Sequence, residues 1–118
     1  MTIATVSIER RDALPVVRVL GDIDFPNSDA VRTDILATVP LDGPGMILDL
    51  TQTTYLDSGG IRLLFEVAER LRVRRQLLVL VASQEALIRR VIALTKLDDV
   101  VLLVATVDEA LNILQDDV

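Results

Sequence analysis

Apolar and polar positions along this chain alternate between short segments with strand periodicity and longer segments with helical periodicity. Loose alternation over residues 3–10 predicts an edge strand, and residues 15–21 predict a second strand that follows a short turn and pairs with the first antiparallel. Apolar runs within residues 46–50, 76–82 and 98–105 predict three further strands. The run at 76–82 is continuous, which is typical of a strand buried on both faces.

Helical spacing of apolar residues separates these strands. It predicts a helix from about residue 26 to 39, a second helix starting near Ile61, a third after Ser83 and a fourth after Thr106, with Ser83 as an N-cap and Thr106 and Glu109 at capping-box spacing. The expected buried faces are Ala30, Val31, Ile35, Leu36 and Val39; Ile61, Leu64, Phe65, Ala68 and Leu71; Leu87, Ile88, Val91 and Leu94; and Ala110, Leu111 and Leu114.

The order of these elements predicts a single α/β domain over residues 1–118, with a mixed, mostly parallel sheet of about five strands and about four helices. The antiparallel N-terminal strand would form one edge of the sheet. Binding sites in such sheets gather at the carboxyl ends of the strands. We therefore expect two loops, residues 21–27 and 55–60, to meet there and to bring Asp22 and Asp24 close to Asp57 and Ser58.

Composition narrows the function. The chain contains neither cysteine nor histidine, so thiolate chemistry and the commonest general base are excluded. The net charge of −6 argues against a nucleic-acid partner. The longest apolar runs have strand length, far short of the roughly 18 residues of a membrane span, and the N-terminus shows no signal segment. We therefore expect a cytoplasmic protein that does not insert into a membrane.

Ser58 lies at a predicted strand-to-helix turn. The chain lacks the residues that a catalytic role of Ser58 would require. A nucleophilic serine needs a base, but there is no histidine, and Lys96 belongs to a different loop. Neither the nucleophile-elbow spacing nor a phosphate-loop pattern occurs. A metal pocket of Asp22, Asp24 and Asp57 would call for a lysine at the end of a later strand, where the chain has alanine. No metal, cofactor or catalytic residue is therefore expected.

Two interpretations of Ser58 stay open from the residues alone: an ordinary helix N-cap, or a serine presented to a partner. The structural explanation for Gly59 and Gly60 is close packing of the turn against neighbouring loops. Glycine at the start of a helix costs roughly 1 kcal/mol per position against alanine, which an ordinary cap does not require. Small residues here would also let a partner approach the backbone closely.

The residues resemble those of a known family. Gly21-Asp22-Ile23-Asp24, then Leu48-Asp49-Leu50 leading to Leu56-Asp57-Ser58-Gly59-Gly60-Ile61, is similar to the anti-sigma factor antagonists, which are single STAS domains. The tail agrees, with Leu94-Thr95-Lys96-Leu97 followed by the last strand and Val107-Asp108-Glu109-Ala110-Leu111. The resemblance spans nearly the whole chain and matches the predicted element order.

The resemblance implies a non-enzymatic switch protein with no cofactor of its own. The unphosphorylated form would bind an anti-sigma factor, often a serine protein kinase, and free the sigma factor; the kinase would phosphorylate Ser58 and a serine phosphatase would reverse this. The expected partner-binding residues are Asp22, Asp24, Asn27, Asp57, Ser58, Gly59, Gly60 and Arg62. The alternative is a STAS adaptor that is never phosphorylated and serves a larger signalling or lipid-transport complex.

Three positions depart from the family pattern. Gly59 stands where the family often has serine, alanine or threonine, Lys96 where it commonly has glycine, and Asp22 where glutamate is frequent. None of these changes removes the phosphate acceptor.

Overall fold

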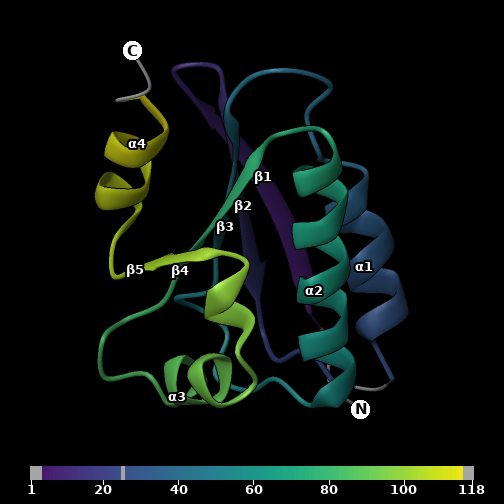
Figure 1. Ribbon diagram of the computed structural model, residues 1–118. Coiled ribbons are helices and arrows are strands. Elements are labelled where there is room, and N and C mark those ends of the chain that lie inside the picture. The colour runs from purple at the N-terminus through teal and green to yellow at the C-terminus, as the bar shows by residue number, and fades with distance from the viewer. Residues whose placement is uncertain (1–3, 25, 116–118) are drawn as a thin grey trace.

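The computed structural model describes residues 4–24 and 26–115. Their strands form one five-stranded sheet with strand order β1-β2-β3-β4-β5 (Figure 1). The strands are β1 (Thr5–Arg11), β2 (Leu14–Leu20), β3 (Gly45–Asp49), β4 (Leu77–Val81) and β5 (Leu102–Val104). The helices are α1 (Ser28–Leu36), α2 (Ser58–Val73), α3 (Leu87–Leu94) and α4 (Val107–Gln115), with a 3-10 turn η1 (Leu97–Asp99). None of the helices in these two ranges is long and apolar enough to cross a membrane.

The predicted sheet topology is confirmed. β1 and β2 form an antiparallel hairpin in which Thr5 faces Leu20 and Arg11 faces Leu14, and every other neighbouring pair of strands is parallel. The hairpin turns through Asp12 and Ala13, which both have positive φ angles, of 52° and 69°. Two such residues in succession match the right-handed twist of the strands, so a two-residue connection suffices.

Helices cover both faces of the sheet. Helices α1 and α2 lie side by side on one face, and α4 lies on the other (Figure 1). Successive side chains of β4 point to opposite faces of the sheet. Leu78 and Leu80 belong to the larger core beneath α1 and α2, whereas Val79 and Val81 pack in the smaller core beneath α4. This strand is therefore buried on both faces, as its continuous apolar run predicts.

Two helices differ from the sequence-based expectation. Helix α1 ends at Leu36 rather than Val39, and Ala30 is exposed. Ser83 does not cap α3, because residues 83–86 form a turn closed by the Ala86 amide donating to the Ser83 carbonyl at 3.0 Å, and the helix starts only at Leu87.

This late start shortens α3 and changes its buried face. With eight residues, the helix turns only one narrow stripe inward, and that stripe consists of Ile88 and Ile92. Leu87 and Leu94, which were expected to be buried, are 66% and 77% exposed. The prediction for that face was therefore wrong at Leu87 and Leu94, whereas Ile88 is buried and Val91 is half-buried against the core.

The last strand is shorter than predicted because η1 occupies Leu97–Asp99 and delays β5 until Leu102. Lys96, the residue before η1, adopts the left-handed conformation with a φ of 62°. Glycine takes up this conformation without strain, whereas a lysine is strained by its Cβ. At the start of α4 the capping prediction is confirmed, since the Glu109 amide donates to Thr106 Oγ1 at 3.1 Å.

Candidate functional site

The loops after β2 and β3 are joined at the carboxyl ends of these strands. The Ile23 amide donates to the Tyr55 carbonyl at 3.0 Å, and the Asp57 amide donates to the Ile23 carbonyl at 3.2 Å. Ile23 and Leu56 thereby form a short parallel bridge that continues the pairing of β2 with β3 beyond the sheet. The expected meeting of the two loops is confirmed.

The polar residues of the first loop mainly hold that loop in shape. Asp22 Oδ1 accepts hydrogen bonds from the Thr54 amide at 3.2 Å and from Thr54 Oγ1 at 2.6 Å. The Asp24 amide donates to Asn27 Oδ1 at 3.0 Å, and the Asn27 amide donates back to Asp24 Oδ1 at 3.3 Å. Asn27 Nδ2 also donates to the Asp22 carbonyl at 2.9 Å. These side chains therefore tie the loop to itself and to the segment after β3.

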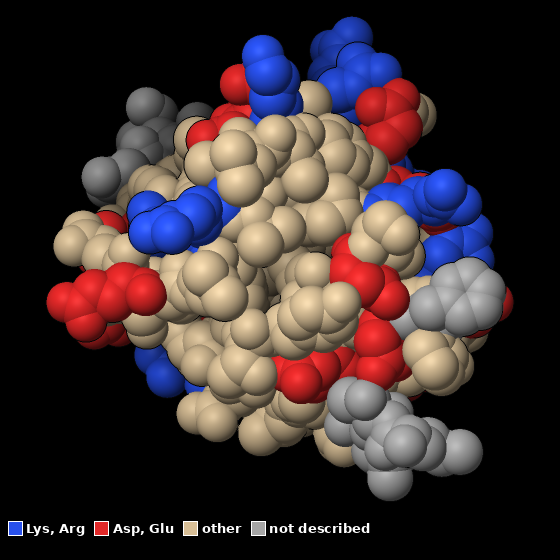
Figure 2. Space-filling view, turned by 90° about the horizontal axis from the view of Figure 1, so that it is seen from below, with Lys and Arg blue, Asp and Glu red and all other residues tan. Residues whose placement is uncertain are grey.

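Figure 2 looks onto this end of the molecule and shows several acidic side chains at the lower right, beside a broad area without charged side chains. Among residues 4–24 and 26–115, no three acidic side chains are grouped so that they could hold a metal ion. Asp22, Asp24 and Asp57 instead accept hydrogen bonds from the chain itself. The site is acidic and is built from hydrogen-bonded loops.

Helix α2 starts at this junction, and its cap is Asp57 rather than Ser58. Asp57 has an extended backbone (φ −93°, ψ −171°), and its Oδ1 accepts a hydrogen bond from the Gly60 amide at 3.1 Å. Of the two interpretations left open for Ser58, the one that made it the N-cap was therefore wrong by one residue. The pairing of the Asp57 amide with Ile23 keeps Asp57 strand-like, so the helix begins after it. Ser58 becomes the first helical residue, and it is exposed to solvent.

The two glycines have different surroundings. A Cβ atom on Gly60 would lie 3.2 Å from Ile23 Cγ2, from the Ile23 carbonyl oxygen and from Leu56 Cδ2. Gly60 is buried, so its lack of a side chain permits the close approach of α2 to the two loops. A Cβ on Gly59 would lie 3.2 Å from Asp57 Oδ1 and from Ser28 Oγ. Those are ends of side chains rather than backbone, so the position is less restricted.

A hollow of about 170 Å³ lies between the first turns of α1 and α2. It is lined by Ser28, Asp29 and Arg32 from α1, and by Ser58, Gly59, Arg62, Leu63 and Glu66 from α2. Arg32 and Glu66 form an ion pair across it. The hydrogen bond to Glu66, then the negative charges of Glu66 and Asp29, raise the pKa of Arg32 above its ordinary value, so Arg32 stays charged. Ser58 therefore stands at the edge of a hollow that contains charges of both signs.

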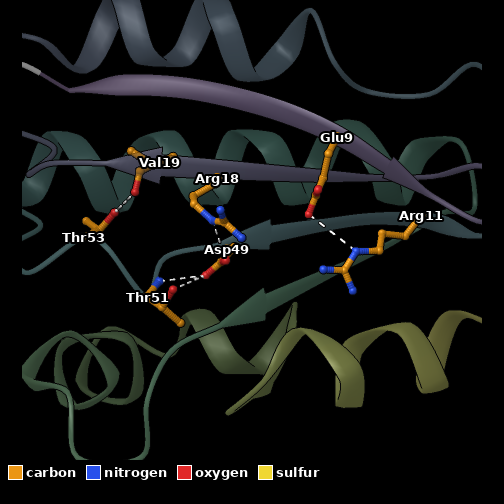
Figure 3. A network of polar contacts seen from close by, with 7 residues as sticks. All are labelled: Glu9, Arg11, Arg18, Val19, Asp49, Thr51 and Thr53. Carbon is orange, nitrogen blue, oxygen red and sulfur yellow. Dashed lines mark hydrogen bonds and ion pairs between the residues drawn. The ribbon is translucent and has the colours of Figure 1, made fainter.

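A buried polar network beneath the site fixes the segment after β3 (Figure 3). The Asp49 carboxylate, 2% exposed, accepts hydrogen bonds from Arg18 Nε at 3.0 Å, the Thr51 amide at 2.9 Å and Thr51 Oγ1 at 2.7 Å. Thr53 Oγ1 donates to the Val19 carbonyl at 2.9 Å. Sequence reasoning missed this supporting role, although an acid inside the apolar run 46–50 was the available signal.

The arrangement offers an accessible hydroxyl rather than an activated nucleophile. The chain has no histidine to accept the Ser58 proton. The carboxylate next to Ser58 in the sequence, Asp57, caps the helix, and Glu66 in the hollow is paired with Arg32. Of the residues predicted to bind a partner, Ser58 and Arg62 are exposed, Gly60 is buried, and Asp22, Asp24, Asn27, Asp57 and Gly59 are half-buried.

Comparison with known proteins agrees with this geometry. The model of the STAS domain family matches residues 5–110, so the chain belongs to the STAS domain family. Its structure is similar to that of an anti-sigma factor antagonist from Mycobacterium paratuberculosis, with 33% sequence identity, a TM-score of 0.86, and coverage of 97% of this chain and 96% of the other.

Two more distant structures share the fold. A candidate anti-sigma factor antagonist from Thermotoga maritima is 19% identical with a TM-score of 0.78, and covers 93% of this chain and 94% of its own. The anti-sigma factor antagonist SpoIIAA in its unphosphorylated form is 19% identical with a TM-score of 0.71, with coverage of 97% and 99%. The resemblance to anti-sigma factor antagonists and the STAS fold are thus confirmed.

Proposed function

We propose that this protein is an anti-sigma factor antagonist that is switched by phosphorylation of Ser58. The unmodified form binds an anti-sigma factor of the serine-kinase type and so frees a sigma factor. The observation that carries the proposal is the exposed Ser58 hydroxyl at the first position of α2, on a turn held by buried hydrogen bonds. The 33% identity to an anti-sigma factor antagonist over nearly the whole chain supports it.

The expected contact surface surrounds this hydroxyl. It comprises Asp22, Asp24, Asn27, Asp57, Ser58, Gly59, Gly60 and Arg62, with Gly60 contributing through its packing rather than through exposed surface. ATP and its metal ion belong to the kinase, and a serine phosphatase removes the phosphate.

Phosphorylation changes the charge of this surface without requiring a new fold. A phosphate adds about −1.5 to −2 charges near neutral pH. The start of α2 tolerates this charge because its free amides and the helix dipole favour anions. Asp22, Asp24 and Asp57 lie on the same acidic junction, so a partner that fits the neutral hydroxyl would meet added like charge and bulk. Both weaken binding.

The test uses purified protein, each kinase-type anti-sigma factor of the source organism, and ATP. One of these partners should add a single phosphate to the wild type and none to Ser58→Ala. Ser28→Ala is the matched control, because Ser28 lines the same hollow, and it should be phosphorylated like the wild type. By calorimetry, Ser58→Ala should bind the partner with wild-type affinity, whereas Ser58→Asp and Ser58→Glu should bind at least about tenfold more weakly, the effect of about 1.4 kcal/mol.

Phosphate on Ser58→Ala, or its loss from Ser28→Ala alone, would move the site away from Ser58. If no kinase-type anti-sigma factor binds the unmodified protein, the switch is refuted and an adaptor role takes its place. Hydrolysis of a test ester that disappears in Ser58→Ala would instead indicate an enzyme.

A further inference from the structure

Of the two arginines that line the hollow, Arg62 is the one without an ion-pair partner among the described residues. It is exposed, and it makes no hydrogen bond or ion pair with the described residues. The other guanidinium of the hollow, on Arg32, is paired with Glu66. Arg62 is absent from the network that shapes the turn, so its side chain is available to a new anion.

The helix directs Arg62 toward Ser58. The two residues are four apart on α2, a spacing at which side chains are neighbours with Cβ atoms about 5–6 Å apart. Side chains on a helix lean toward its N-terminus. A long guanidinium side chain at position 62 can therefore reach back over the first turn, and Arg62 and Ser58 line the same hollow.

Two of the three carboxylates near the hollow, Glu66 and Asp57, have partners in the described residues. Glu66 is held by Arg32, and Asp57 Oδ1 accepts from the Gly60 amide. Asp29 lies in the first turn of α1, and its negative charge helps to raise the pKa of Arg32. A phosphate on Ser58 would meet the amides of α2 and the unpaired guanidinium of Arg62, whereas among these carboxylates only Asp29 accepts no hydrogen bond and makes no ion pair with the described residues.

We propose that Arg62 holds the phosphate of phosphorylated Ser58 in an internal, charge-assisted pair. This rests on the proposed function, because Ser58 must be the residue that is phosphorylated. The fork of an arginine matches two phosphate oxygens at once. In the unmodified protein Arg62 is free to pair with a carboxylate of a partner. In the phosphorylated protein the phosphate on Ser58 pairs with Arg62 instead. The modification then removes a contact as well as adding a charge.

The test does not need a kinase. Phosphoserine is introduced at position 58 by genetic encoding, and its second ionisation is followed by phosphorus NMR against pH. In Arg62→Gln the midpoint should lie about 0.5 pH unit higher than in the wild type, because a paired cation favours the dianion. Arg62→Lys should recover part of that shift, since a lysine supplies the charge without the fork.

Arg70→Gln is the matched control. Arg70 lies on the same helix and is also exposed, but it is about two turns further from Ser58 than Arg62 is. Its variant should titrate like the wild type. Equal shifts in Arg62→Gln and Arg70→Gln, or a shift below about 0.1 unit in Arg62→Gln, would overturn the pairing.

This outcome is separate from that of the proposed function. The kinase could fail to phosphorylate Ser58 while Arg62→Gln still raises the ionisation midpoint of the encoded phosphate. In that case the regulatory proposal fails and the pairing stands. If the kinase modifies Ser58 and the shift is absent, the switch works without Arg62. Circular dichroism spectra and thermal melts of all variants establish that each one is folded.

Discussion

The two adjacent glycines of α2 should respond in opposite directions to the same substitution. In a helix, alanine is favoured over glycine by about 1 kcal/mol. At Gly59 the new methyl group meets only the ends of the Asp57 and Ser28 side chains, each at 3.2 Å, so a small shift that keeps the Asp57 cap makes room for it. We expect Gly59→Ala to be stabilising by up to about 1 kcal/mol.

At Gly60 the methyl group meets the Ile23 carbonyl oxygen, Ile23 Cγ2 and Leu56 Cδ2, each at 3.2 Å. Overpacking of this kind costs about 1–3 kcal/mol. It also acts on the Ile23–Leu56 bridge, the element that joins the two loops. After subtraction of the gain in helix propensity, we expect Gly60→Ala to lower the free energy of unfolding by about 1 kcal/mol.

Urea unfolding followed by circular dichroism measures both changes. The two variants should differ by about 2 kcal/mol in the free energy of unfolding, with midpoints displaced on opposite sides of the wild type and with similar slopes. Gly60→Ala as stable as Gly59→Ala would refute the packing argument. A changed slope for Gly60→Ala would mean that the loops had separated in the native state, which the same argument does not predict.

Three further changes test the surroundings of the site. Lys96→Gly should stabilise the protein by about 0.5–1 kcal/mol by relieving the left-handed backbone, while Lys96→Ala should bring no gain; thermal melts compare them. Asp49→Ala should destabilise by about 2 kcal/mol, because it removes the hydrogen bonds that the buried Asp49 carboxylate accepts from Arg18 and Thr51, and a wild-type urea midpoint would contradict the role of this network. Asp57→Ala should cost about 1 kcal/mol through the lost helix cap, and Asp57→Asn should restore most of it.

The sequence predicted those features of the fold that depend on periodicity. The mostly parallel sheet, its antiparallel edge and the meeting of the two loops all follow from apolar patterns and the alternation of strands and helices. Helix boundaries were less accurate where two capping residues compete. Asp57 and Ser58 are equally good N-caps by type, and only the hydrogen bond from the Asp57 amide to Ile23, 34 positions earlier, decides between them.

Tertiary contacts also explain the other differences. Nothing local at Gly60 reveals that the residue faces Ile23, since this requires two loops to be placed in space. The left-handed conformation of Lys96 was equally invisible in its residue type, although the family's frequent glycine at that position agrees with the observed φ of 62°. Asp49 stood out as an acid in an apolar run, but its partner Arg18 lies on a different strand.

In this site, the groups that hold the turn in place are different from the Ser58 hydroxyl that a partner would meet. The turn is held from below by Asp49 and Thr53, from one side by Ile23, and at the helix start by Asp57. None of these groups needs the Ser58 hydroxyl. A phosphate placed there alters the surface that a partner meets while the hydrogen bonds that define the turn persist. A switch built this way acts through charge, so the effect of phosphorylation on partner binding should weaken as ionic strength rises.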